Sequence, residues 1–293
     1  VLGPRTQEEY LEVVGEARIA DLRRRAEPDS WRADEAAWPP DLDAPVGAWE
    51  TAAVYGARYV AARVADPGFD AVLAGAGVAN LAAWLAVATA RDAGSPVVLT
   101  AELGLWGYEP TPADPFVFNH RSFPTATMVA DTETILGTFC GGPGTRLLGC
   151  LGAAQVDRRG NVNSTLIPGR AFLVGSGGGN DVASSADEVV VVATLAPRRT
   201  VEAVPYVTSP GRWVRALVTD LGTFEKRGDD LVLSAVPVGN GTIDDAVERV
   251  RAVCGWQLET AADVLPLPPP APGEVEQLRR WDPRQRFLRP DPA

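Results

Sequence analysis

The sequence is poor in histidine and cysteine. Its 293 residues include one histidine, His120, and three cysteines, Cys140, Cys150 and Cys254. A nucleophile–histidine–acid triad and a multi-histidine metal centre both require imidazole in the site, so the single histidine weakens both classes. The cysteines are odd in number and form no CxxC pair. We therefore expect reduced thiols in a cytoplasmic protein, without a metal site or a disulfide framework.

The chain also lacks a long hydrophobic run and an excess of basic residues. No segment approaches the roughly 18 uninterrupted apolar residues of a transmembrane helix, and no signal-peptide pattern opens the sequence. The net charge is −11 and the sequence pI is about 4.7. This balance argues against nucleic acid and against an anionic membrane surface as partners. It leaves room for a small anionic ligand, because backbone amides and a few arginines can bind one locally.

The hydrophobic pattern that is present is typical of an α/β protein. It predicts a helix over 49–65, a buried strand over 70–74, an alanine-rich helix over 78–92 and a second buried strand over 96–101. A strand, a helix and a strand in this order form a β-α-β unit. We therefore expect an open, mostly parallel sheet that is flanked by helices on both faces.

The rest of the chain carries weaker signals. Residues 1–48 are polar and charged, and they predict one amphipathic helix around 11–22 in an N-terminal helical extension. Residues 49–293 form the main domain, and its proline-rich segment 266–272 is expected to carry no core. The remaining predicted elements are strands at 146–151, 162–166, 171–174, 188–195, 200–206, 213–219 and 231–237, and helices at 131–139, 243–253 and within 273–293.

Glu102 is the first candidate for chemistry. The segment 97–107 is a buried strand that runs into this carboxylate and then into Gly104 and Gly107. Functional side chains of open α/β sheets gather at the carboxyl ends of the strands, and glycines allow backbone to approach a ligand. The alternative is a solvated acid at a strand end. The residues of this segment leave both interpretations open.

Two glycine-rich loops are candidate binding elements. Gly75 and Gly77 follow a strand and open a helix, as in a dinucleotide fold with Glu102 as the ribose-binding acid. Asn80 at the third glycine position counts against that alternative. The second loop, 175–181, has four glycines within five residues, and its amides could hold an anion or an oxyanion. A plain surface turn is the alternative for this loop.

Together with the polar run 152–163, these segments carry a resemblance to a known family. Glu102-Leu103-Gly104-Leu105-Trp106-Gly107 is similar to the Glu-x-Gly-x-x-Gly segment of the β subunits of class I CoA-transferases of the glutaconate type. Residues 152–163 match that family's Gly-Ala-x-Gln-Val-Asp-x-x-Gly-Asn-x-Asn signature, with Gln155, Asp157, Gly160, Asn161 and Asn163 as its structural residues. The loop Gly177-Gly178-Gly179-Asn180-Asp181 and the segment 218–224 are also similar. The resemblance spans about 50–290.

The resemblance implies an activity. Glu102 would be a nucleophile that carries CoA as a glutamyl-CoA thioester between an acyl-CoA and a carboxylic acid. CoA and acyl-CoA would be substrates, with no permanently bound cofactor and no metal, and an α subunit would complete a heteromeric enzyme. The residues proposed to bind CoA or an oxyanion are Gly75, Gly77, Val78, Gly104, Gly177, Gly178, Gly179, Asn180 and Asp181.

Other activities remain open at this point. The residues flanking Glu102 depart from the family's usual Ser-Glu-Asn-Gly form, because the chain has Ala101-Glu102-Leu103-Gly104. The chain also resembles a related branch, whose members hydrolyse a carbon–carbon bond in steroid-ring CoA thioesters and lack this glutamate. Acyl-CoA hydrolysis, ring opening, a dinucleotide-dependent oxidoreductase and a non-catalytic structural role are therefore kept as alternatives.

Overall fold

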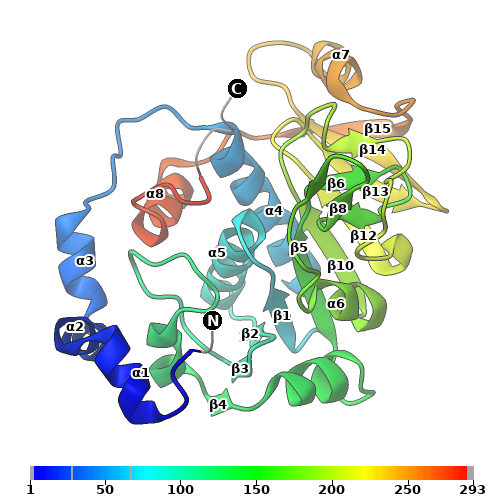
Figure 1. The fold of residues 1–293 in the computed structure, drawn as a ribbon. Coiled ribbons are helices and arrows are strands. Elements are labelled where there is room, and N and C mark those ends of the chain that lie inside the picture. The colour runs from blue at the N-terminus through cyan, green and yellow to red at the C-terminus, as the bar shows by residue number, and fades with distance from the viewer. Residues whose placement is uncertain (1–2, 28, 66–67, 289–293) are drawn as a thin grey trace.

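A large sheet forms the centre of the computed structural model, which describes residues 3–27, 29–65 and 68–288 (Figure 1). Its strands are β1 (Ala71–Ala74), β2 (Val98–Ala101), β3 (Leu105–Trp106), β4 (Met128–Val129), β5 (Leu147–Gly152), β10 (Glu188–Val192), β12 (Val214–Val218), β13 (Thr223–Arg227), β14 (Asp230–Pro237) and β15 (Thr260–Leu267). In space the order is β15-β14-β13-β12-β10-β5-β1-β2-β3-β4. The middle strands β12, β10, β5, β1 and β2 run parallel, which confirms the predicted α/β sheet.

Helices cover both faces of this sheet, as the β-α-β pattern predicts. Helices α4 (Ala48–Ala65) and α5 (Val78–Asp92) pack together on one face, and α8 (Pro272–Trp281) packs outside them. The other face carries α6 (Gly179–Ser185), α7 (Ile243–Val253) and the π-helix η2 (Thr134–Cys140). Consecutive residues of β10 alternate between the two hydrophobic layers. The central strands are therefore buried on both sides, which explains their continuous apolar sequences.

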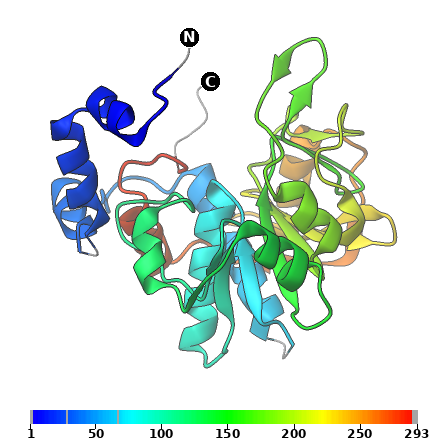
Figure 2. The same cartoon turned by 60° about the horizontal axis from the view of Figure 1, so that its bottom comes forward.

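Two small sheets stand above the carboxyl ends of the parallel strands. One joins β6 (Gln155–Asp157), β7 (Val162–Asn163) and β11 (Thr200–Val201). The other is the hairpin of β8 (Leu166–Ile167) and β9 (Ala171–Phe172), which projects from the body (Figure 2). The strands predicted at 162–166, 171–174 and 200–206 are thus much shorter than expected, because their residues turn between these small sheets.

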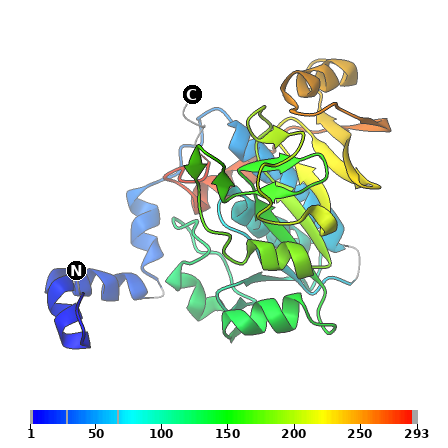
Figure 3. The same cartoon turned by 45° about the vertical axis from the view of Figure 1, so that its right-hand side comes forward.

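The N-terminal segment contains more helix than the sequence predicted. The structure has α1 (Gln7–Val14), α2 (Glu16–Ala26) and α3 (Trp31–Ala37), so the single helix expected around 11–22 is wrong. Gly15 separates the first two helices with a φ of 81°, a conformation that glycine adopts without strain. None of the three helices has a buried residue, and α1 and α2 extend away from the sheet (Figure 3).

Strands β3, β4, β6, β13 and β15 were not predicted. Strand β15 includes Pro266, within the segment expected to carry no core, and its side chains are mostly exposed. Proline is tolerated there because β15 lies at the edge of the sheet and needs only one hydrogen-bonded neighbour. The other predicted elements are present with small shifts at their ends. Within the described ranges, no helix is long and apolar enough to cross a membrane.

Candidate active site

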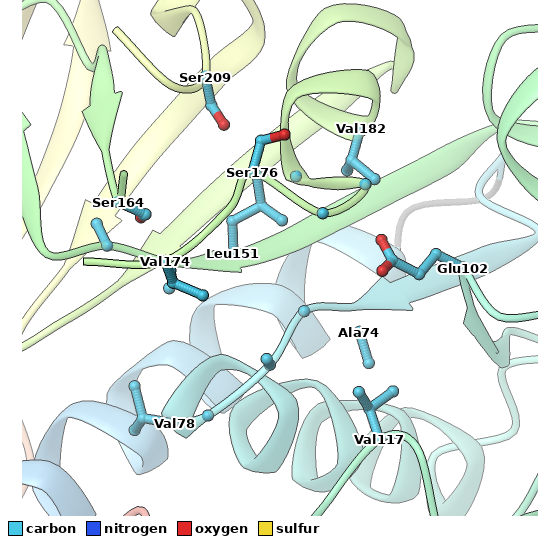
Figure 4. A pocket seen from close by; sticks show the side chains of 18 of the residues that line it. Ala74, Val78, Glu102, Val117, Leu151, Ser164, Val174, Ser176, Val182 and Ser209 are labelled. Atoms are coloured by element: carbon cyan, nitrogen blue, oxygen red, sulfur yellow. The ribbon is translucent and has the colours of Figure 1, made fainter. Parts of the chain in front are cut away.

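A cavity of about 640 Å³ lies where β1, β2 and β5 end. Parallel strands release their following loops at one edge of the sheet, so loops far apart in the chain meet there. The loop after β1, the residue after β2 and the glycine-rich loop before α6 all line this cavity. Figure 4 shows Glu102 facing it, opposite the loop that carries Ser176.

Glu102 is held by the turn that follows β2. Strand β3 folds back antiparallel onto β2, with Ala101 opposite Leu105, and the hydroxyl of Thr100 donates to the Leu105 carbonyl at 2.8 Å. This turn requires Gly104, whose φ is +113° and whose Cα faces the carbonyl of Ala130 so closely that a Cβ would overlap it. The turn leaves the Glu102 side chain half-buried at the cavity wall.

Gly178 contacts the carboxylate of Glu102 directly. Its backbone amide donates a hydrogen bond to this carboxylate. A Cβ on Gly178 would overlap Oε2 of Glu102 and lie 2.9 Å from its Cδ, so only glycine permits the approach. The carbonyl of Gly178 accepts from Val182 at 2.9 Å, which fixes the loop as the start of α6. The composition of the loop therefore has a specific physical reason at Gly178.

The pKa of the Glu102 carboxyl is raised above its ordinary value. Burial is the largest cause, because it removes water from the ionised form. The amide of Gly178 opposes the shift by donating to the carboxylate, and the negative charge of Asp181 adds to it. The site thus combines a poorly hydrated carboxylate with one backbone donor aimed at its oxygen.

The loop after β1 forms another wall of the cavity. Gly75 donates its amide to the carbonyl of Cys150 at 2.8 Å, and a Cβ on Gly75 would lie 2.6 Å from that carbonyl oxygen. Gly77 has a φ of +78° and precedes α5, whose first residue is Val78. The helix N-terminus at Val78 therefore opens towards the cavity, where its amides favour negative charge.

The proposed binding residues divide into two groups. Gly104, Asn180 and Asp181 do not line the cavity: Gly104 packs under Ala130, and the other two belong to the first turn of α6. The residues that the structure brings to the cavity are Gly75, Gly77, Val78, Gly177, Gly178 and Gly179, together with Glu102.

The first half of the polar signature is a hydrogen-bonded turn. Oδ1 of Asp157 accepts from the amides of Arg159 and Asn161 at 3.0 Å each, and Oδ2 accepts from the Asn161 side chain at 3.0 Å. Gly160 has a φ of +80° at the centre of this turn. Oδ1 of Asn161 accepts from the Gly211 amide at 2.9 Å, so the turn also holds a distant segment.

The second half of the signature places one hydroxyl group, that of Ser164, at the cavity. Asn163 donates to Oε1 of Gln155 at 2.9 Å and accepts from the amides of Thr165 and Leu166 at 3.1 Å. The intervening Ser164 lines the cavity. Residues 155, 157, 160, 161 and 163 themselves do not line it. They connect β6, β7 and the loops on either side of the cavity.

Several lining residues carried no signal in the sequence. Ser176, Thr208 and Ser209 come from loops, while Trp49 lies in the first turn of α4 and Phe287 follows α8. Ser164 was available in principle, because it directly follows Asn163 of the signature. Phe287 lies 185 positions beyond Glu102 and reaches the cavity only through the packing of α8 on α4 and α5.

The other side chains considered from the sequence lie outside the cavity. Nε2 of His120 is 2.6 Å from the carbonyl oxygen of Arg25, at the surface. Trp106 packs against Phe139 with ring centroids 4.9 Å apart. The three cysteines are free, and within the described ranges no group of three or more histidine, cysteine or acidic side chains is placed to hold a metal ion.

Asn80, at the third position of the glycine pattern, is also accounted for. It is buried and donates its side-chain amide to the carbonyl of Pro115 at 2.7 Å. A dinucleotide-binding turn would have a glycine or another small residue at this position. Asn80 instead holds the long loop that follows β3.

Comparison with known proteins identifies relatives of one kind by sequence. The chain is 31% identical over 217 residues to the β subunit of 3-oxoadipate CoA-transferase of Pseudomonas knackmussii, and the match covers 67% of this chain and 81% of that protein. It is 30% identical over 167 residues to the β subunit of glutaconate CoA-transferase of Acidaminococcus fermentans, and this match covers 49% of this chain and 60% of that protein. No family model matches the chain.

Solved structures show the same fold. Glutaconate CoA-transferase of Acidaminococcus fermentans superposes with a TM-score of 0.66 and 23% identity, covering 81% of this chain and 97% of that one. The decarboxylase AibA/AibB superposes with a TM-score of 0.62 and 20% identity, covering 83% and 98%. These structural similarities establish the fold of the chain, whereas the sequence similarities establish its evolutionary relationship to the CoA-transferase subunits.

Proposed function

The chain belongs to the class I CoA-transferases, among their β subunits, and we propose that Glu102 is its nucleophile towards a CoA thioester. The observation that carries this proposal is the contact between Glu102 and Gly178 in a cavity at the carboxyl ends of the strands. The side chain is half-buried, and an amide donor already points at its oxygen.

The proposed reaction uses the carboxylate twice. An oxygen of Glu102 attacks the thioester carbonyl, the carbon–sulfur bond breaks, and CoA leaves as a thiolate from an acyl–glutamyl anhydride. The thiolate then attacks the glutamyl carbonyl, and the acyl group leaves as a free carboxylate. The product is a glutamyl-CoA thioester on Glu102. An acceptor acid reverses these steps and departs as the new acyl-CoA.

The amide of Gly178 supports the step at the glutamyl carbon. When CoA thiolate adds to this carbon, negative charge develops on the Glu102 oxygen that faces the Gly178 amide. A preorganised donor of this kind stabilises a developing oxyanion by about 3–4 kcal/mol. The raised pKa has the same origin as the reactivity, because a carboxylate with little hydration is a stronger base and nucleophile.

CoA, acyl-CoA and a carboxylic acid are the proposed substrates, with no permanently bound cofactor. The reaction moves CoA between carboxyl groups, so it needs neither electron transfer nor a Lewis acid. The free thiols of Cys140, Cys150 and Cys254 fit a reducing compartment, and we place the enzyme in the cytoplasm.

An α subunit is the proposed partner. The relatives are themselves named as subunits of CoA-transferases. The exposed apolar side chains of Phe172 and Val174, which are 71% and 58% exposed, support an interface beside the cavity mouth. Co-expression with the matching α subunit followed by light scattering tests this. A chain that stays alone at micromolar concentration would contradict the proposal.

Residues 1–48 are proposed to be an extension of a domain that spans 49–293. The buried residues of the described chain begin at Glu50, and α1 to α3 contribute none. Limited proteolysis of the complete protein tests this division. We expect early cuts within 3–47 and a resistant fragment that starts near Ala48. Early cuts throughout the main body would contradict it.

The activity itself is tested by comparing the wild-type complex with its Glu102→Gln variant. We expect exchange of CoA between an acyl-CoA and a labelled carboxylic acid, and a loss of at least about 1,000-fold in the variant. Release of free acid without exchange would identify an acyl-CoA hydrolase instead. Full exchange by the variant would contradict the role of Glu102 and leave it a structural residue.

A further inference from the structure

The cavity beside Glu102 has few charged side chains. Among the described residues that line it, only Glu102 and Arg286 are charged, and Glu102 is the proposed nucleophile. Arg286 is exposed and also lines a neighbouring hollow next to Phe116 and Arg284. An ion pair at such an exposed position contributes little to binding. The described residues that line the cavity therefore offer no buried cation to a substrate.

Apolar side chains form one wall of the cavity. In Figure 4 Ala74 and Val117 lie on the side of Glu102 that faces away from Ser176, and Val78 lies further along that side. The serines lie on the opposite side, around Ser176. A chain with amide groups, such as the arm of CoA, finds hydroxyl partners on the serine side. The acyl group then faces the apolar wall.

Phe118 extends this wall towards solvent. It lines the cavity, yet 59% of its surface is exposed, whereas its neighbour Val117 is 4% exposed. Phe287 approaches from the C-terminal segment, and its ring lies 4.9 Å from that of Phe116. An apolar group that enters here removes aromatic surface from water, which favours binding in proportion to the area covered.

From these observations we propose that the transferred acyl group is an uncharged hydrocarbon acyl, selected by the wall of Val117 and Phe118. This inference rests on the proposed transferase function. A second carboxylate on the acyl chain would lose part of its hydration against this wall, where the described residues offer no buried cation, and would lie near the negative charge of Glu102. A methyl group at the same place would gain from burial.

The test compares thioesters that differ only at the end of the acyl chain. The complex with the α subunit is mixed with hexanoyl-CoA or adipoyl-CoA, and formation of the Glu102 thioester is followed in a single turnover. No acceptor acid is needed, because the acyl group is released as its own acid. We expect hexanoyl-CoA to react at least about 100-fold faster. Butyryl-CoA, which is two methylenes shorter, should react about ten- to fifteenfold more slowly than hexanoyl-CoA. Burial of each methylene is expected to change the rate by about three- to fourfold.

Two phenylalanines of the same loop provide the matched variants. Phe118→Ala should slow hexanoyl-CoA about tenfold and weaken the preference over butyryl-CoA. Phe123→Ala should leave both rates unchanged, because Phe123 is 38% exposed and does not line the cavity. An equal effect of the two substitutions would overturn the assigned wall.

A preference for adipoyl-CoA that disappears in the Arg286→Gln variant would overturn the proposal and identify a dicarboxylic substrate. Equal rates for adipoyl-CoA and hexanoyl-CoA would overturn it as well. Both outcomes still give the Glu102 thioester, so the transferase function survives them. If no acyl-CoA gives the Glu102 thioester, the proposed transferase function is contradicted, and the proposed acyl class is contradicted as well.

Discussion

Gly178 gives the most specific prediction about the site. Its φ and ψ are −78° and 3°, which any residue can adopt, so an alanine there meets no backbone strain. The obstacle is the Cβ, which would overlap Oε2 of Glu102 and lie 3.1 Å from Cδ1 of Leu136. The Gly178→Ala substitution therefore forces the carboxylate away from the amide that donates to it.

The expected loss follows from that displacement. Removal of one preorganised donor typically lowers kcat by about 100- to 1,000-fold. We therefore expect Gly178→Ala to lower the rate of Glu102 thioester formation by at least about 100-fold. Crowding of this kind also costs about 1–3 kcal/mol of stability. That cost should shrink when Glu102 is replaced by alanine as well, because the double variant has no carboxylate to displace.

Gly144 serves as a matched control. It is exposed, a Cβ on it meets open space, and it does not line the cavity. Gly144→Ala should keep its activity within about threefold, since a surface change of this size alters free energy by only about 0.5 kcal/mol. The assays are single-turnover kinetics and urea unfolding. Wild-type activity of Gly178→Ala, or equal losses in both variants, would refute the assigned contact.

Three other substitutions have defined outcomes. Glu102→Gln should raise the melting temperature at neutral pH, because burial raises the pKa of this carboxyl and makes the ionised form costly in the folded protein. The folded state binds the proton more tightly than the unfolded state, so wild-type stability rises as the pH falls from the raised pKa towards the ordinary pKa. The difference in melting temperature between the variant and the wild type should therefore shrink over this pH range. A difference that stays unchanged or grows would contradict this. Glu50→Ala should cost about 3–5 kcal/mol in urea unfolding, since it leaves Arg279, whose side chain is 3% exposed, without its charge partner. Asp34→Ala should lower the free energy of unfolding by about 1–3 kcal/mol and speed proteolysis of the loop 103–127. The reason is that Arg121 on this loop is 1% exposed and forms an ion pair with Asp34. An unchanged rate of cleavage would contradict the role of this ion pair.

The main sheet was predictable because its signals are local. The runs at 71–74 and 97–99 are apolar throughout, the alanine-rich helix lies between them, and buried parallel strands have this pattern. Strand β15 was not predictable in the same way. Its side chains are mostly exposed and it contains Pro266, so neither alternation nor continuous apolarity marks it. The sheet accepts it because β14 offers a free edge.

The candidate site was predictable in its parts but not in its arrangement. A carboxylate after a buried strand and a loop with four glycines are visible in the sequence. Their contact joins positions 102 and 178, which depends on the order β10-β5-β1-β2 in the sheet. The family resemblance indicated that the two loops work together. The residues themselves give no reason to choose Gly178 over Gly177 or Gly179.

The residues that form the walls of the cavity were the least predictable part of the site. Phe118 and Phe287 come from a long loop and from the C-terminal segment. The carboxylate of Asp282 holds this C-terminal segment, because it accepts from the amides of Arg286 and Phe287 at 2.8 and 2.7 Å. Such a turn around a buried acid depends on the packing of α8, and local sequence does not encode that packing.

Intact-mass analysis of the assembled protein after mixing with hexanoyl-CoA determines whether Glu102 is the nucleophile. We expect a covalent adduct equal to CoA less one water, mapped by peptide sequencing to Glu102 and absent from the Glu102→Gln variant. An adduct on another residue, or one that persists in that variant, would contradict the assignment of Glu102 as the nucleophile.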